Sequence, residues 1–134
     1  MLGGRETGIF RAAMDEIELV KLTGRGTRPW TKNEIKVIQR FIKANPNMTQ
    51  KQAYYGLINK LGYVGHHINN VDDFPDWAGD ARNIFFLKKG AGEEHVMLGH
   101  LGHYKNSSTG MLIDREAMIR MLNLGDGHLV TGGR

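Results

Sequence analysis

The chain of 134 residues contains no cysteine, which excludes disulfide bonds and thiolate metal sites. It also has no apolar run near the roughly 18–20 residues that a membrane-spanning helix needs, so we expect no membrane partner. Proline is scarce, with 3 residues, and no repeat or low-complexity block interrupts the chain. A chain of this length suits one domain with a modest hydrophobic core.

The sequence carries a positive net charge and a cluster of histidines. The net charge is +4 with histidine neutral, and the sequence pI is about 9.5. A basic surface favours polyanions, because each neutralised phosphate releases counterions. Most of the 6 histidines fall within one stretch of the second half, namely His66, His67, His95, His100 and His103. This clustering points to a metal site or to acid–base chemistry.

Helices are predicted for the first half. Apolar residues recur at helical spacing from Glu6 to Leu22, which predicts an amphipathic helix. Two later threonines are each followed three residues on by Glu or Gln, at Thr31–Glu34 and Thr49–Gln52. This is the spacing of a capping box, so each threonine is expected to begin a further helix. Gly62 is expected to end the last of these helices.

The two short helices over Lys32–Leu61 can also be read as a helix-turn-helix that binds DNA. Their apolar stripes are broad, however, and the second helix offers only Lys51, Gln52 and Lys60 as contacts to bases or phosphates. We therefore favour a supporting role in packing.

The second half changes from helices to short strands. Extended segments are predicted at Tyr63–Ile68 and Ile84–Leu87, joined by a polar loop, with a helix at about Glu93–Leu101 and a last helix from Asp114 to Leu122. The expected fold class is α+β, with a helical support region (1–62) followed by a ββα-metal core (63–104). A closing turn and helix (105–124) and a disordered tail (125–134) complete a single domain over 1–134.

The adjacent histidines can divide the work of cutting a phosphodiester, which needs a base for water and a cation for the phosphate. Neighbouring strand residues point to opposite faces, so one imidazole can bind a metal while the other faces the water. A free histidine has a pKa of about 6.5, so a neutral imidazole is available as a base. Asn83 can hold the base in its orientation by bonding the backbone beside His67 across the hairpin.

Histidines on the following helix would complete the cation site. His100 and His103 share a helix face at i, i+3, whereas His95 and His100 are about 140° apart on an ideal helix. A single divalent ion is expected, and the sequence does not choose among Mg²⁺, Mn²⁺, Zn²⁺ and Ni²⁺. Each of these residues also has an ordinary interpretation as a surface or turn residue, and the case depends on their order and spacing.

A series of short segments stands out together: Gly65–Asn69, Pro75, Gly79–Ile84, Glu94–His95, His100, Asn106–Gly110 and Leu112–Arg115, with Arg25–Glu34 upstream of them. In these segments, over about residues 25–115, the chain resembles the GHH-signature branch of the HNH/endonuclease VII superfamily, whose members are the C-terminal toxin domains of bacterial polymorphic toxins. It implies a metal-dependent nuclease.

The resemblance also implies roles for particular residues. His66 matches the metal-binding histidine, His67 the general base and Asn83 the asparagine that orients the base. His100 matches the helix histidine, and the remaining ligand is His95 or His103. The gap of five residues between His95 and His100 departs from the family's usual four, which leaves that last ligand open.

The expected function is therefore a DNase toxin, delivered as part of a larger bacterial protein and acting in the cytoplasm of a target cell. Such a toxin implies a cognate immunity protein, acidic where it covers a basic cleft. The expected contacts to the nucleic-acid backbone are Arg82, Lys88, Lys89, Lys105 and Arg115. An RNase, a nicking enzyme of a mobile element, and a non-enzymatic nucleic-acid-binding module with a structural metal are the alternatives.

Overall fold

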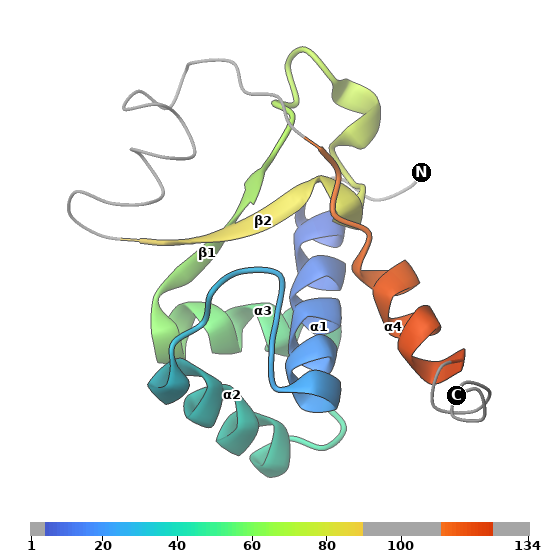
Figure 1. Cartoon of the computed structure of the whole chain (residues 1–134). Helices are drawn as coiled ribbons and strands as arrows, with labels where there is room; N and C mark the ends of the chain where they lie inside the picture. The colour runs from blue at the N-terminus through green and yellow to red at the C-terminus, as the bar shows by residue number, and fades with distance from the viewer. Residues whose placement is uncertain (1–4, 90–110, 125–134) are drawn as a thin grey trace.

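A computed structural model describes residues 5–89 and 111–124 of the chain (Figure 1). Within that part, the elements are α1 (Arg5–Thr23), α2 (Lys32–Ala44), α3 (Gln50–Gly56), a π-helical turn (Leu57–Leu61), β1 (Tyr63–His67), two 3₁₀ turns (Pro75–Trp77 and Ala81–Asn83), β2 (Ile84–Lys88) and α4 (Arg115–Leu124). Four α-helices and a two-stranded antiparallel sheet confirm an α+β fold.

The predicted helix ends are confirmed by their local hydrogen bonds. The Thr31 hydroxyl accepts from the Glu34 amide at 3.1 Å, and the Glu34 carboxylate accepts from the Thr31 amide at 2.9 Å. Thr49 and Gln52 form the same reciprocal box at the start of α3. Gly62 ends the helical region with a φ of 77°, a conformation that glycine adopts without steric cost. The turn that precedes Gly62 is π-helical rather than α-helical.

Helix α1 is the centre of the molecule, and the hairpin crosses the end at which it begins (Figure 1). The buried apolar core joins α1 to the other elements and consists of Ala12, Ala13, Ile17, Val20, Trp30, Ile38, Ala53, Leu57, Tyr63, Ile84 and Phe86. Gly65 lets the hairpin approach α1 closely, because a Cβ there would lie 2.8 Å from Ile9 Cγ2. The core therefore fixes one face of the hairpin on α1.

The strands pair in a register that separates the two histidines. His67 lies opposite Ile84, and His66 lies opposite Phe85. Ile84 belongs to the core on α1, so His67 lies on the helix-facing side of the sheet and His66 on the other side.

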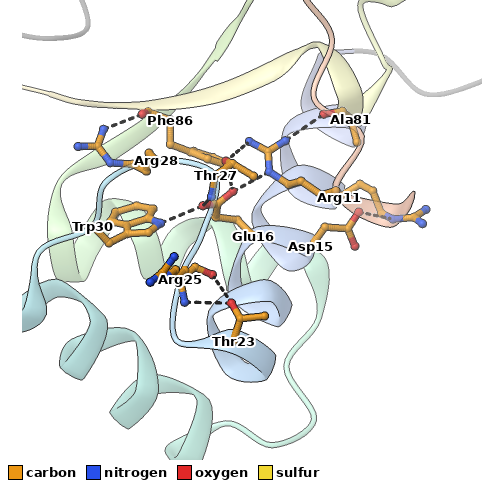
Figure 2. A network of polar contacts seen from close by, with 11 residues as sticks. Arg11, Asp15, Glu16, Thr23, Arg25, Thr27, Arg28, Trp30, Ala81 and Phe86 are labelled. Carbon is orange, nitrogen blue, oxygen red and sulfur yellow. Dashed lines mark hydrogen bonds and ion pairs between the residues drawn. The ribbon is translucent and has the colours of Figure 1, made fainter. Parts of the chain in front are cut away.

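A charged group is buried in this core. Glu16 on α1 is 0% exposed, and its carboxylate accepts hydrogen bonds from the Thr27 amide at 2.7 Å and the Trp30 indole at 2.9 Å (Figure 2). Arg115, at the start of α4, is 2% exposed and pairs with the same carboxylate at 2.7 Å. Burial by itself raises the pKa of Glu16, but Arg115 and the hydrogen bonds outweigh it and hold the pKa below its ordinary value of 4.5.

This arrangement corrects the role predicted for Arg115. Its guanidinium also reaches the Thr27 hydroxyl at 3.2 Å and the Ala81 carbonyl at 3.4 Å. A buried side chain with these partners is part of the core and is not accessible to a phosphate. The prediction that Arg115 grips nucleic acid was therefore wrong.

The last helix is capped as predicted, with the Asp114 carboxylate accepting from the Ala117 amide at 2.9 Å. The predicted helix at Glu93–Leu101, the turn that precedes residue 111, and the tail at 125–134 lie outside the described residues. None of the helices in 5–89 and 111–124 is long and apolar enough to cross a membrane.

Replacing Arg115 with Met should lower the free energy of unfolding by about 3–5 kcal/mol, because the Glu16 charge would be left buried without its partner. Urea denaturation followed by circular dichroism at neutral pH measures this change. Arg11→Met is the matched control, since Arg11 pairs with Glu116 at 3.0 Å but is 41% exposed. A loss of about 1 kcal/mol or less is expected there.

The same pair makes stability depend on pH. Since the pKa of Glu16 is lower in the folded than in the unfolded state, its contribution is present above about pH 4.5 and is lost as the pH falls through the folded value. The stability advantage of the wild type over Glu16→Gln should therefore shrink in acid. A stabilising buried pair would be contradicted if Arg115→Met and Arg11→Met lowered the free energy of unfolding equally. It would also be contradicted if the stability advantage of the wild type over Glu16→Gln stayed constant down to the pH of acid unfolding.

Candidate active site

The candidate site is built at the end of the hairpin where β1 finishes and β2 begins. His66 is 4% exposed, and its ring meets the ring of Phe85 edge-on, with centroids 5.1 Å apart. His67 is half-buried on the opposite face. The two imidazoles thus enter different environments, as the alternation of a strand requires.

The His67 ring is oriented by a backbone carbonyl. Its Nε2 lies 3.0 Å from the carbonyl oxygen of Ala78, in the loop that joins the strands. A carbonyl oxygen only accepts, so this bond places the proton on Nε2 and the lone pair of the neutral ring on Nδ1. The tautomer that results is one in which Nδ1 can accept a proton.

Asn83 joins the two ends of the same loop. Its side chain is fully buried and accepts from the Asn69 amide at 2.8 Å, while its Nδ2 donates to the Asn69 carbonyl at 2.9 Å. The Asn83 Nδ2 also lies 3.3 Å from the carbonyl oxygen of Trp77, the residue before Ala78. Asn83 therefore bonds across the hairpin, but to the backbone of Asn69, two residues beyond His67, and not to the backbone beside His67 as predicted.

Helix α1 and the segment before α4 both contact this loop. A Cβ on Gly8 of α1 would lie 2.8 Å from the backbone carbon of Gly79, so the helix and the loop backbone are in close contact. The Ile113 amide donates to the Arg82 carbonyl at 2.6 Å. These contacts support both sides of Asp80, which caps the 3₁₀ turn that ends at Asn83.

The predicted phosphate contacts do not gather at one place. Arg82 is exposed, but its guanidinium pairs with Asp80 at 2.7 Å, and this bond lowers the pKa of Asp80. Lys88 and Lys89 are exposed at the other end of the hairpin, with Lys88 opposite Tyr63. Four strand residues, or about 13 Å, separate that end from His67. Lys105 lies outside the described residues.

The predicted metal ligands are only partly within the structure. His66 is described, whereas His95, His100 and His103 lie outside the described residues. In the described part alone, no three His, Asp or Glu side chains are grouped so that they could hold a metal ion. The chemistry of His66 fits a ligand, because a buried neutral imidazole is a common donor to divalent zinc and nickel.

Comparisons with protein families, with characterised proteins and with solved structures found no match to this chain.

Two contributors to the site were not identified from the sequence. Asn69 has a detectable signal, because it follows β1 and is placed across the hairpin from Asn83. Ala78 has none, since it acts through a main-chain carbonyl that every residue possesses.

Replacing Asn83 with Ala should lower the free energy of unfolding by about 2–4 kcal/mol, because the buried amide and carbonyl of Asn69 would lose their partner. Urea denaturation tests the stability. The long-range ¹H–¹⁵N spectrum of the histidine rings tests the orientation and should show His67 protonated at Nε2 in the wild type only. Asn59→Ala, at an exposed position of the π-helical turn, is the matched control. Unchanged stability and an unchanged tautomer in Asn83→Ala would show that these bonds do not hold the site.

Proposed function

We propose that the chain is a metal-dependent endonuclease with a ββα-metal core, cleaving DNA and using His67 as its general base. The observation that carries this proposal is the His67 ring, whose Nε2 is held 3.0 Å from the Ala78 carbonyl within a loop that Asn83 fixes. An oriented imidazole with its lone pair on Nδ1 suits the removal of a proton from water.

The residues of the chain divide the reaction as follows. His67 Nδ1 takes a proton from water, and the oxygen of that water forms a bond to the scissile phosphorus. The bond from phosphorus to the leaving sugar oxygen breaks, and that oxygen leaves with the electron pair and takes a proton from solvent. The Nε2–H bond to Ala78 then stabilises the imidazolium, because a carbonyl dipole accepts more strongly from a charged ring. Asn83 is a positioning residue, since it acts on the loop and not on the substrate.

A divalent ion held by His66, together with His100 and either His95 or His103, would supply the positive charge that the scissile phosphate and leaving oxygen require. His66 and His67 lie on opposite faces of β1, so the scissile phosphate would have to lie at the end of the strand, where the ion on His66 and the water on His67 can both reach it. Arg82, Lys88, Lys89 and Lys105 remain candidates for contacts to the substrate.

The biological setting is proposed from the resemblance alone. It comprises an interbacterial toxin, delivered within a larger protein, active in the cytoplasm of a target cell and neutralised by an immunity protein. RNA is the nearest alternative substrate. Parallel digestion of plasmid DNA and total RNA distinguishes a DNase from an RNase.

Purified protein should cleave plasmid DNA in the presence of Mg²⁺, Mn²⁺, Zn²⁺ or Ni²⁺, and EDTA should stop the reaction. His67→Ala should lower the rate by about 10²–10⁴-fold, because the general base is lost. Asn83→Ala should lower it by about 10–100-fold through the loss of orientation. His128→Ala, outside the histidine cluster, is the control and should keep the wild-type rate.

Intact plasmid with every metal would sink the nuclease proposal. Binding of DNA without cleavage, together with unfolding on metal removal, would instead favour a non-enzymatic nucleic-acid-binding module.

The two histidines should also separate in metal binding. His66→Ala should lose both tight binding of Zn²⁺ or Mn²⁺ and cleavage, whereas His67→Ala should lose cleavage and still bind one ion per chain. Isothermal titration calorimetry at constant pH measures the binding. If both variants bind the ion as the wild type does, His66 is not a ligand.

A further inference from the structure

The positive charge of the protein is concentrated in one part of the chain. Residues 20–71 contain nine Lys and Arg residues and a single acidic residue, Glu34. That segment has a net charge of +8, so the remaining residues together carry −4 against the total of +4. The loop at 72–80, which joins the strands, contributes four aspartates and no basic residue. The basic surface therefore belongs to the helical region and not to the loop of the candidate site.

Four of these basic residues form a line along α2, which we name the α2 basic stripe: Lys32, Lys36, Arg40 and Lys43. At 100° per residue, they fall within an arc of about 80° on the helix. All four are exposed. Glu34 points to a different side, where its carboxylate accepts from the Tyr63 hydroxyl at 2.7 Å. The stripe is thus a continuous cationic face.

The residues of this face form no ion pair in the described part of the chain. Ion pairs there involve Arg11, Arg82 and Arg115, and none involves a residue of the stripe. Like charges three or four residues apart on a helix repel each other by about 0.2–0.5 kcal/mol per pair. The stripe contains such pairs at Lys32–Lys36, Lys36–Arg40 and Arg40–Lys43, and an external polyanion would relieve their repulsion.

The stripe also borders a hollow between α2 and the end of α1. The hollow has a volume of about 450 Å³ and is lined by Lys21, Lys36, Gln39, Arg40, Ile42 and Lys43. Among these residues, Ile42 is the only apolar one and none is aromatic. Protein–protein interfaces depend on aromatic and apolar anchors at their centres, whereas contacts to nucleic-acid backbones use Lys, Arg and Gln. The composition favours a phosphate backbone over an acidic protein.

The length of the stripe agrees with this ligand. From Lys32 to Lys43, α2 rises by about 16 Å. One strand of duplex DNA places a phosphate about every 3.4 Å along the helix axis and winds around that axis, so a straight stripe of this length can face a few phosphates before the strand turns away. Tyr63, at the start of β1, is bonded to α2, and His67 lies at the far end of the same strand. The stripe is therefore separate from the candidate active site.

We propose that the α2 basic stripe, with Lys21 beside it, is a second nucleic-acid surface that holds the phosphate backbone of a duplex without reading its sequence. It deepens the proposed function, in that it supplies substrate contacts away from the hairpin. Binding at the stripe does not itself require cleavage, so the two proposals can fail separately.

The test measures the salt dependence of duplex binding in the His67→Ala background with EDTA present, so that no cleavage occurs. Fluorescence anisotropy with a labelled duplex of about 20 base pairs gives the affinity from about 50 to about 200 mM salt. Lys36→Gln/Arg40→Gln is compared with Lys51→Gln/Lys60→Gln, an exposed pair on the following helical elements with the same change in charge. Glutamine keeps the helix propensity similar, and thermal melts confirm folding.

Neutralising Lys36 and Arg40 should reduce the slope of log affinity against log salt by about 1.8, because two phosphate contacts are lost. Between about 50 and about 200 mM salt, the parent would then lose about 12-fold more affinity than this variant. The control pair should keep the parent slope. Equal slopes in both variants, a larger change in the control pair, or a parent that does not bind duplex DNA would overturn the proposal.

These outcomes separate the two proposals. If wild-type protein cleaves plasmid but the Lys36/Arg40 variant binds with the parent slope, only the stripe is wrong. If the slope changes as expected while no metal supports cleavage, the stripe stands and the nuclease proposal falls. A stripe variant that loses affinity for an acidic protein but none for DNA assigns the surface to that partner and overturns the proposal.

Discussion

The Glu16 carboxylate in the core is the constraint on which the rest of the described structure depends. A buried charge is tolerated only where partners surround it, and its partners here come from distant parts of the chain. Arg115 is 99 residues away in sequence. Thr27 and Trp30 donate to the carboxylate, and its remaining partner, Arg115, fixes where the segment that leads into α4 attaches. Three regions of the chain are thereby joined around a single side chain.

That attachment extends to the candidate site through the backbone. Arg115 lies within reach of the Ala81 carbonyl, and Ile113 bonds the carbonyl of Arg82, immediately before Asn83. Asn83 then holds Asn69 and Trp77, and the neighbouring Ala78 carbonyl orients His67. A continuous series of short contacts thus runs from the core to the imidazole, and the ring is held by main-chain groups of a loop that the core supports.

The distribution of charge gives the molecule two unlike sides. The helical region is basic, whereas the loop between the strands is acidic and keeps Arg82 in a pair with Asp80. A polyanion near this protein is attracted to the helices and repelled by the loop aspartates. The end of the hairpin with His66 and His67 lies beside that acidic loop, so a bound cation there would change the local field more than any single lysine.

The sequence by itself determined the elements whose signals are local. Capping boxes at Thr31 and Thr49, the left-handed Gly62 and the strand at His66 and His67 depend on neighbours within a few residues, and each was predicted. The link from Asn83 across the hairpin followed from the expected pairing of two short strands. Tertiary structure alone decided the partner of Glu16, because a carboxylate on an apolar helix face does not specify which distant arginine will neutralise it. It also decided that Ala78 orients His67, since a main-chain carbonyl leaves no trace in the sequence.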